Sequence, residues 1–197
     1  MSGEGPVPPE EKAYSYRPSL LGAPYEFRLG AQALEWRVGN RSGRVAWREV
    51  ERVRLSFRPV SMQRHRFVAE IWASGAPKLT IMSSSWKSMM VQERRDKPYA
   101  DFIAGLHRHL AQAQSRAVFE QGTNPLRYWP GVAVFAAVSL GLAVLVVRAL
   151  QAQTFGGAIF VAAFLVLFLW RGGEYFRRNR PRLYRADAPP ADLIPKA

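Results

Sequence analysis

Residues 128–171 read YWPGVAVFAAVSLGLAVLVVRALQAQTFGGAIFVAAFLVLFLWR, and this stretch decides how the chain is organised. Neither residues 131–147 nor residues 154–170 include a charged side chain. Each run approaches the roughly 20 apolar residues that a helix needs to cross a bilayer core. Because backbone amides in lipid must be satisfied within the segment, each run is predicted to be helical. The sequence therefore predicts a two-helix transmembrane hairpin over residues 130–171; a buried hairpin in a soluble core is the alternative.

Arginines beside the two runs predict the orientation of the hairpin, because cytoplasmic flanks carry the excess of positive charge. The flanking arginines are Arg108, Arg116, Arg127, Arg171, Arg177, Arg178, Arg180, Arg182 and Arg185, whereas the turn has only Arg148. We therefore expect a multi-pass protein of the bacterial inner membrane with both termini in the cytoplasm. Arg148 is expected to extend its stem to the far headgroups rather than act as an intramembrane functional charge.

Aromatic residues mark the two membrane interfaces of the predicted hairpin. Together with Arg148, the expected interface anchors are Tyr128, Trp129, Trp170 and Tyr175.

Small residues recur at four-residue spacing on both predicted spans, and this spacing lets helix backbones approach closely. They are Ala133, Ala137 and Gly141 on the first span and Ala158 and Ala162 on the second. We expect these residues to pack the two helices against each other. A homodimer through the remaining small face is the alternative.

The composition limits the possible partners and chemistry. The formal net charge of +13 is concentrated outside the spans, with +8 on residues 1–129 and +4 on residues 171–197. A basic surface beside a membrane is attracted to anionic lipids. The absence of cysteine excludes disulfides and thiolate chemistry.

The polar part of the chain alternates between apolar and polar residues, which is typical of antiparallel strands with one buried face. Residues 1–24 are rich in Gly, Pro and Glu and are predicted to be a disordered arm, with order beginning near Tyr25. The alternation runs from Tyr25 to Ile81 and changes phase at residues 49–51, which indicates a bulge or corner. Residues 83–97 fit either a last strand or a short helix.

A helical period follows, with Tyr99, Phe102, Ile103, Leu106 and Leu110 on one stripe. We expect this amphipathic helix to extend to about Ala117. The predicted domain covers residues 25–120, and residues 121–129 form a linker to the hairpin.

The order of short strands followed by one helix resembles that of a pleckstrin-homology-like domain. Residues 43–55, GRVAWREVERVRL, are similar to the third-to-fourth strand region of bacterial domains of this kind. The resemblance implies an α+β fold, an antiparallel barrel or sheet capped by a C-terminal amphipathic helix. It also implies a binding or scaffolding module rather than an enzyme.

Arginines dominate the polar side of the predicted strands. Those placed away from the core are Arg28, Arg37, Arg52, Arg54, Arg58 and Arg66. They are interpreted either as a solvated face or as a contact surface for anionic lipid headgroups. Trp36 and Trp47 fall on the apolar side, so they are predicted to be core residues rather than stacking platforms for nucleic acid.

The basic, proline-rich tail over residues 172–197 cannot form a long helix. Its apolar residues are Leu183, Tyr184, Leu193 and Ile194. We expect either docking of an extended peptide through these residues or a disordered tail.

No pattern typical of an active site is found. His65, His107 and His109 lack acidic residues at metal-ligand spacing and are predicted to be exposed, so we expect no metal, no cofactor and no catalytic residue. The favoured function is non-catalytic anchoring, scaffolding or sensing at an anionic membrane face. An accessory subunit of a membrane protein complex, docking through the hairpin and tail, is the alternative.

Overall fold

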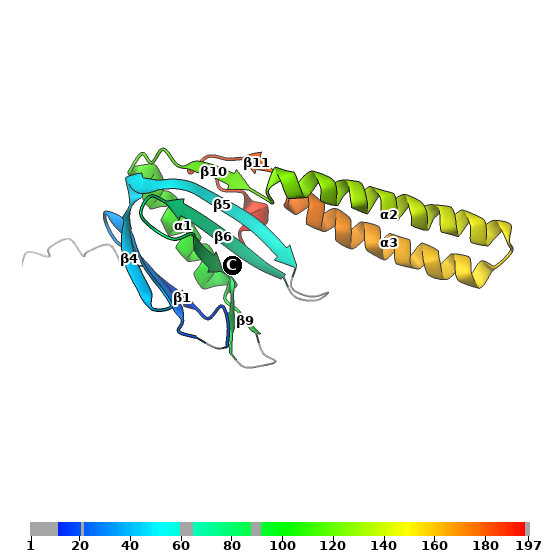
Figure 1. Cartoon of the computed structure of the whole chain (residues 1–197), viewed down its shortest axis with the longest axis horizontal. Coiled ribbons are helices and arrows are strands. Elements are labelled where there is room, and N and C mark those ends of the chain that lie inside the picture. The colour runs from blue at the N-terminus through cyan, green and yellow to red at the C-terminus, as the bar shows by residue number, and fades with distance from the viewer. Residues whose placement is uncertain (1–11, 21, 60–64, 88–91, 196–197) are drawn as a thin grey trace, which may run out of the picture. The chain divides into compact units, whose positions relative to one another are not determined.

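The computed structural model describes residues 12–20, 22–59, 65–87 and 92–195. The chain divides into two compact units, one formed by Met1–Glu120 with Leu183–Ala197 and the other by Gln121–Arg182. The first unit combines antiparallel sheets with one long helix, and the second is a helical hairpin (Figure 1). The predicted α+β class and the two long apolar helices near the carboxyl end are thus confirmed.

The first sheet is antiparallel, with its strands in the order β1-β2-β3-β4. The strands are β1 (Ala13–Tyr16), β2 (Tyr25–Leu29), β3 (Ala33–Val38) and β4 (Arg41–Ala46). The sequence predicted order only from Tyr25, but β1 pairs with β2 and buries Tyr14 and Tyr16. The two tyrosine rings give this strand enough buried apolar surface to be ordered, although the residues around it are rich in Gly, Pro and Glu. The first part of the predicted arm, residues 1–11, lies outside the described residues.

The second sheet has the order β11-β10-β5-β6-β7. Its strands are β5 (Val50–Pro59), β6 (His65–Ala73), β7 (Leu79–Met82), β10 (Val118–Gln121) and β11 (Arg182–Leu183). The predicted break in phase is the short 3-10 helix η1 (Trp47–Glu49), followed by a register shift between Val50 and Arg52. The Glu49 carboxylate accepts a hydrogen bond from the Ala46 amide at 3.1 Å and holds this corner.

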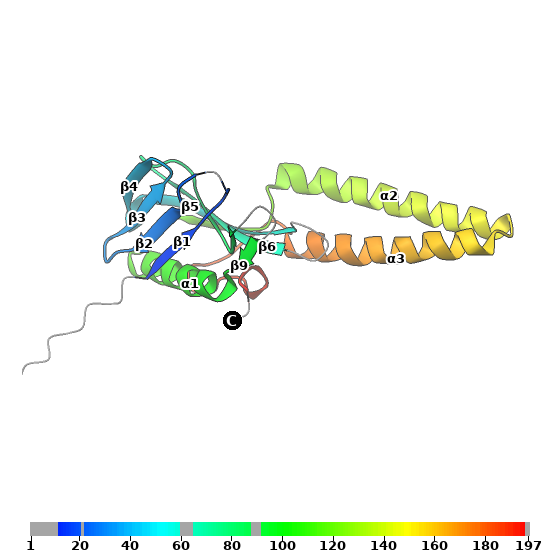
Figure 2. The same ribbon diagram turned by 90° about the horizontal axis from the view of Figure 1, so that it is seen from below.

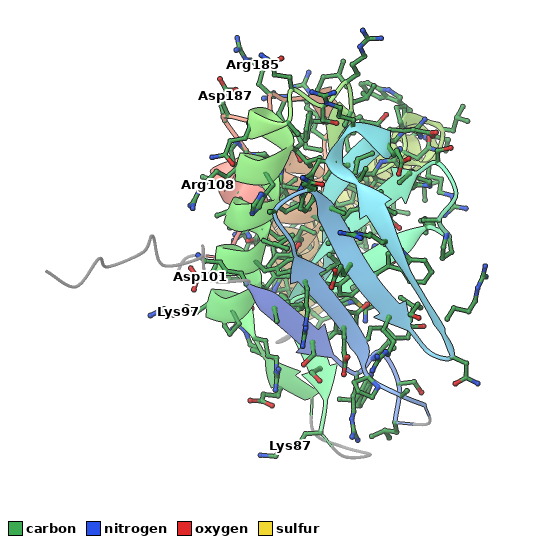
Figure 3. The ribbon with its side chains drawn as sticks, turned by 90° about the vertical axis from the view of Figure 1, so that its left-hand side faces the viewer. Lys87, Lys97, Asp101, Arg108, Arg185 and Asp187 are labelled. Atoms are coloured by element: carbon green, nitrogen blue, oxygen red, sulfur yellow. The ribbon has the colours of Figure 1, made fainter. Side chains whose placement is uncertain are left out.

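Residues 83–97 resolve into a hairpin of β8 (Ser84–Trp86) and β9 (Gln92–Arg94), with residues 88–91 outside the described part. Helix α1 (Asp96–Gln112) follows and ends earlier than the predicted Ala117. Gln114 adopts a positive φ of 49°, which turns the chain back toward β10. In Figure 3 the labelled side chains of Lys97, Asp101 and Arg108 project from the outer side of α1.

The two sheets and α1 enclose one core, because the buried side chains of all three form a single cluster. Figure 2 shows α1 running beside the first sheet, and Figure 1 shows it behind β5 and β6. Among the described residues the sheets do not close into a barrel. Instead, side chains join β1 to β7: the Tyr14 hydroxyl donates to the carbonyl of Met82 at 2.6 Å, and Tyr16 donates to that of Thr80. In a closed barrel, backbone hydrogen bonds would join these two edge strands. Here the tyrosine hydroxyls connect β1 to β7 instead, and we call this gap between the two strands the seam.

The second unit consists of α2 (Pro125–Gln151) and α3 (Phe155–Arg178). Both helices are long and apolar enough to cross a membrane, and they extend beyond the predicted residues 130–171. Asn124 caps α2 by accepting a hydrogen bond from the Leu126 amide at 3.0 Å. The open end of the hairpin is tied by the Tyr128 hydroxyl, which donates to the Phe176 carbonyl at 3.2 Å.

Candidate functional site

The predicted basic surface is divided between two sheets. Arg28 and Arg37 lie on the first sheet, whereas Arg52, Arg54, Arg58 and Arg66 lie on the side of the second sheet that faces away from the core. Two residues that the sequence analysis missed, Trp72 and Lys78, complete the second set. We call this set the basic face; its members are Arg52, Arg54, Arg58, Arg66, Lys78 and Trp72, with Glu70 and Glu120.

Glu120 on β10 organises one end of the basic face. Its Oε2 accepts from Arg54 Nε at 2.9 Å and from Nη2 at 2.5 Å, and its Oε1 lies 3.8 Å from Arg52 Nε. The Arg54 side chain is only 14% exposed, and Arg52 is 47% exposed. Arg54 is therefore a structural part of the face, whereas Arg52 is available to solvent.

Trp72 is in register with Arg52 at one end of the basic face, and three cations approach its ring. Its ring centroid is 5.4 Å from Arg52 Cζ, 5.2 Å from Arg54 Cζ and 5.6 Å from Lys78 Nζ. Each separation is within the range of cation–π attraction. The ring thus holds like charges close together, which their mutual repulsion would otherwise separate.

Glu70 on β6 is the second carboxylate of the face. Its Oε1 is 3.1 Å from Arg58 Nη2 and 2.9 Å from Lys78 Nζ, and its side chain is 7% exposed. Burial alone raises the pKa of this carboxyl group, but the Lys78 hydrogen bond and the Arg58 charge outweigh burial and lower the pKa. Glu70 is therefore an ionised, buried partner for two surface cations.

The outer side of the first sheet carries a weaker charge pattern. A hollow of about 410 Å³ is lined by Glu26, Arg28, Glu35, Trp36, Arg37, Ser42, Gly43 and Arg44. Cross-strand pairing sets Glu26 against Arg37 and Glu35 against Arg28 and Arg44, so opposite charges alternate. Trp36 and Trp47 are buried, as predicted. The net positive charge on this side is smaller, and we place the candidate site on the second sheet.

The carboxyl-terminal segment packs against the first unit. Leu193, in the short 3-10 helix η2 (Ala191–Leu193), is 1% exposed and belongs to the core cluster. Tyr184 and Ile194 pack against the same cluster, whereas Leu183 is 74% exposed. Of the four tail residues singled out in the sequence, three therefore contact the core and one faces solvent.

The prediction that His107 is exposed is wrong, because this segment covers it. His107 is 2% exposed and contacts Tyr184 and Phe119. His109 points to another side of α1 and stacks on Trp47 with ring centroids 5.0 Å apart. Among the described residues, no group of three His, Asp or Glu side chains is placed to hold a metal ion.

The small residues of α2 do not face α3 as predicted. Ala133, Ala137 and Gly141 are exposed, and a Cβ at Gly141 would meet no atom within 4 Å. The contact is made by a different side of α2, where Phe135 packs on Phe168, Phe176 and Gly172 of α3. On α3, Ala158 is buried and Ala162 is half-buried.

The predicted interface anchors differ in their surroundings. Tyr128 is 8% exposed and packs on Phe176, so its hydroxyl is used within the hairpin. Trp129 and Trp170 are 62% and 64% exposed, and Tyr175 is half-buried. Arg148 is exposed in the last turn of α2.

Comparison of the chain with protein-family models, with curated proteins and with solved structures found no match.

Proposed function

We propose that this chain is a two-span membrane protein whose basic face contacts anionic lipid headgroups. The spans are supported by exposure: none of the most apolar window of α2 and 6% of that of α3 is buried in protein. A helix that is apolar all round and uncovered by protein needs an apolar solvent. The arginines flanking the helices support cytoplasmic termini at a bacterial inner membrane.

The first unit is proposed to be a pleckstrin-homology-like module. Its element order supports this assignment, because four strands in one sheet are followed by β5–β7 of a second sheet and then by α1. The open seam between β1 and β7 is a departure from a closed barrel. The proposed role is non-catalytic: the module anchors, scaffolds or senses at the membrane face.

The single observation that carries this role is the composition of the basic face. Five cations and two carboxylates share the outer side of the second sheet, and three of the cations, Arg52, Arg54 and Lys78, approach the ring of Trp72. Glu70 and Glu120 hold the side chains in place but leave an excess of positive charge. A preorganised cationic surface attracts an anionic bilayer by about 1 kcal/mol for each well-placed cation.

The experiment uses the absence of cysteine from the chain. Thr80→Cys, on the outer side of β7, carries an environment-sensitive dye in the full chain in nanodiscs; Ser42→Cys, on the first sheet, is the control position. We expect the dye at position 80 to shift when phosphatidylglycerol replaces part of the phosphatidylcholine, and salt to reverse the shift. The variant with Arg52→Gln and Lys78→Gln should respond more weakly. An identical signal in both lipids would exclude the proposed contact.

The alternative is an accessory subunit docking through its hairpin and tail, and docking through the tail receives less support. Tyr184 and Leu193 are already packed against the chain's own core, so these side chains are not free for a partner. Capture of a stable membrane-protein partner by the full chain, with no response to anionic lipid, would favour that alternative.

A further inference from the structure

Two arginines of the basic face lie directly opposite each other. Arg58 on β5 pairs in register with Arg66 on β6. Like charges at directly opposed positions are destabilising, and natural sheets usually place an opposite charge there. The carboxylate that accepts from Arg58 is Glu70, which is in register with Arg54 rather than with Arg58. The Arg58–Arg66 position therefore has two cations and no anion in register with it.

Arg66 and a neighbouring serine each have a buried polar atom without a hydrogen-bond partner among the described residues. Arg66 Nε is buried without a hydrogen-bond partner among the described residues. Ser56, one row along the same side of the sheet, is 4% exposed, and its Oγ is also without a described partner. Buried polar groups are nearly always hydrogen-bonded, and an unsatisfied one costs about 1–3 kcal/mol. Two such atoms beside an excess of positive charge indicate a missing acceptor.

The register explains why the Ser56 hydroxyl is covered. Successive rows across β5 and β6 pair Arg58 with Arg66, Ser56 with Val68 and Arg54 with Glu70. To reach Glu70, the Arg58 side chain crosses the Ser56–Val68 row, and both residues of that row are buried. We therefore infer that the Arg58 side chain covers Ser56. When its guanidinium leaves Glu70, the carboxylate keeps Lys78 as its partner.

We propose that Arg58, Arg66 and Ser56 form a binding site for a phosphate monoester, with Arg58 exchanging its contact with Glu70 for the bound group. A monoester carries close to two negative charges at neutral pH and has three free oxygens. Two guanidinium groups and one hydroxyl match those oxygens, because the planar fork of arginine binds phosphate with paired hydrogen bonds. A phosphodiester has one charge and fewer free oxygens. The site rests on the proposed function and adds a preference among anionic lipids.

The electrostatic state of Arg66 agrees with the proposed site. Burial and the nearby Arg58 charge lower the pKa of Arg66 below its ordinary value. Both effects disfavour the charged form, and a bound dianion would reverse the second of them.

The test compares two anionic lipids at equal surface charge, with the dye at position 80 of the full chain in nanodiscs. Phosphatidic acid supplies a monoester and phosphatidylglycerol a diester. We expect a half-maximal response at about tenfold less phosphatidic acid than phosphatidylglycerol, as one additional charge-assisted hydrogen bond to the monoester would give. Soluble glycerol phosphate, added to phosphatidylcholine nanodiscs, tests whether the monoester must belong to a lipid. Its binding would assign the site to a soluble ligand of the same chemistry.

The variants make the result specific. Arg66→Gln should abolish the preference for the monoester, whereas Arg44→Gln, which removes an exposed charge on the first sheet, should retain it. Ser56→Ala should weaken monoester binding without lowering the stability of the ligand-free chain, because it removes an unsatisfied hydroxyl. Equal responses to the two lipids, or a preference that persists in Arg66→Gln, would overturn the site but leave the proposed function standing. No response to either lipid would overturn both.

Discussion

The imidazole Nε2 of His107 lies 2.9 Å from the hydroxyl of Tyr184, and this contact joins α1 to a segment that follows the helical hairpin. Nδ1 of His107 lies 2.8 Å from the Ile103 carbonyl, which can only accept, so Nδ1 carries the proton. Nε2 therefore accepts the hydrogen bond from Tyr184. Burial raises the pKa of Tyr184, which keeps its hydroxyl protonated as the donor.

Acid should weaken the first unit through His107. Burial lowers the pKa of this imidazole, against the opposing effect of the Ile103 hydrogen bond. Because the folded pKa lies below the unfolded value near 6.5, the contribution to stability is complete above about pH 6.5 and is lost as pH falls below it. We expect the free energy of unfolding of the full chain in detergent, measured by denaturant titration, to fall between pH 7.5 and pH 5, by at most about 1.4 kcal/mol per pH unit for one site.

His107→Phe should reduce that pH dependence, since the imidazole no longer titrates. Glu70 acts in a separate window: its folded pKa is lowered, so its contribution is lost only below the unfolded carboxyl pKa, at about pH 4. A midpoint that changes equally with pH in His107→Phe would assign the pH dependence to other groups.

The carboxyl-terminal segment should contribute directly to the stability of the first unit. Leu193→Ala removes a side chain that is 1% exposed, and such truncations cost about 2–4 kcal/mol. Leu183→Ala is the matched control, because this leucine is 74% exposed and should change stability by less than about 0.5 kcal/mol. Denaturant titration of the two full-length variants measures the difference. Equal midpoints would mean that Leu193 does not pack in the core in solution.

The alternation of residues predicts single strands and helices, but it does not predict contacts between distant segments. Alternation along single strands identified the apolar side of β2, β3, β5 and β6, and uncharged runs identified the two helices. Contacts between distant segments leave no such local signal, so the burial of His107 under Tyr184 was not predicted. The tail was recognised as apolar, but nothing in its composition distinguishes the exposed Leu183 from the buried Leu193.

The candidate site was predictable to the same extent. The alternation of apolar and polar residues placed six arginines away from the core. Alternation does not show which sheet a strand joins, so Arg28 and Arg37 were grouped with residues of another face. Trp72 lies at a position on β6 where the alternation predicts a polar residue. An aromatic residue at such a position could have indicated from the sequence that Trp72 belongs to the basic face. The partnership of Arg54 with Glu120 depends on β10 joining β5, which the local sequence does not specify.

Glu70 should be essential to the integrity of the basic face. Glu70→Gln leaves Arg58 and Lys78 without their buried carboxylate, and breaking a buried ion pair costs about 3–5 kcal/mol, or less here because both cations are half exposed. Glu26→Gln is the control, since its contact with Arg37 is 3.5 Å long and exposed. Denaturant titration should give a clear loss for the first variant and almost none for the second. A neutral Glu70→Gln variant would show that the cations do not depend on this carboxylate.

Two adjacent glycines of α3 should respond in opposite ways to alanine. A Cβ at Gly172 would overlap the ring of Phe135, whereas a Cβ at Gly173 would meet no atom within 4 Å. Gly172→Ala should therefore weaken the packing of α2 on α3. Gly173→Ala should be neutral or stabilising by up to about 1 kcal/mol, because alanine is the better helix former. Unfolding of the hairpin in mixed micelles measures both, and equal effects would contradict the observed helix contact.

The orientation of the hairpin can be determined with single cysteines, because the chain has none of its own. Gln153 lies in the turn between α2 and α3, and Ser74 lies in the turn between β6 and β7 of the first unit. If the termini are cytoplasmic, a membrane-impermeant maleimide added to intact cells should label Gln153→Cys, while Ser74→Cys should react only after the cells are opened. The reagent distinguishes the two sides because a charged maleimide does not cross the hydrocarbon core, where an ion is strongly disfavoured. Labelling of Ser74→Cys in intact cells would place the basic face outside the cytoplasm, away from the leaflet whose anionic lipids it is proposed to contact.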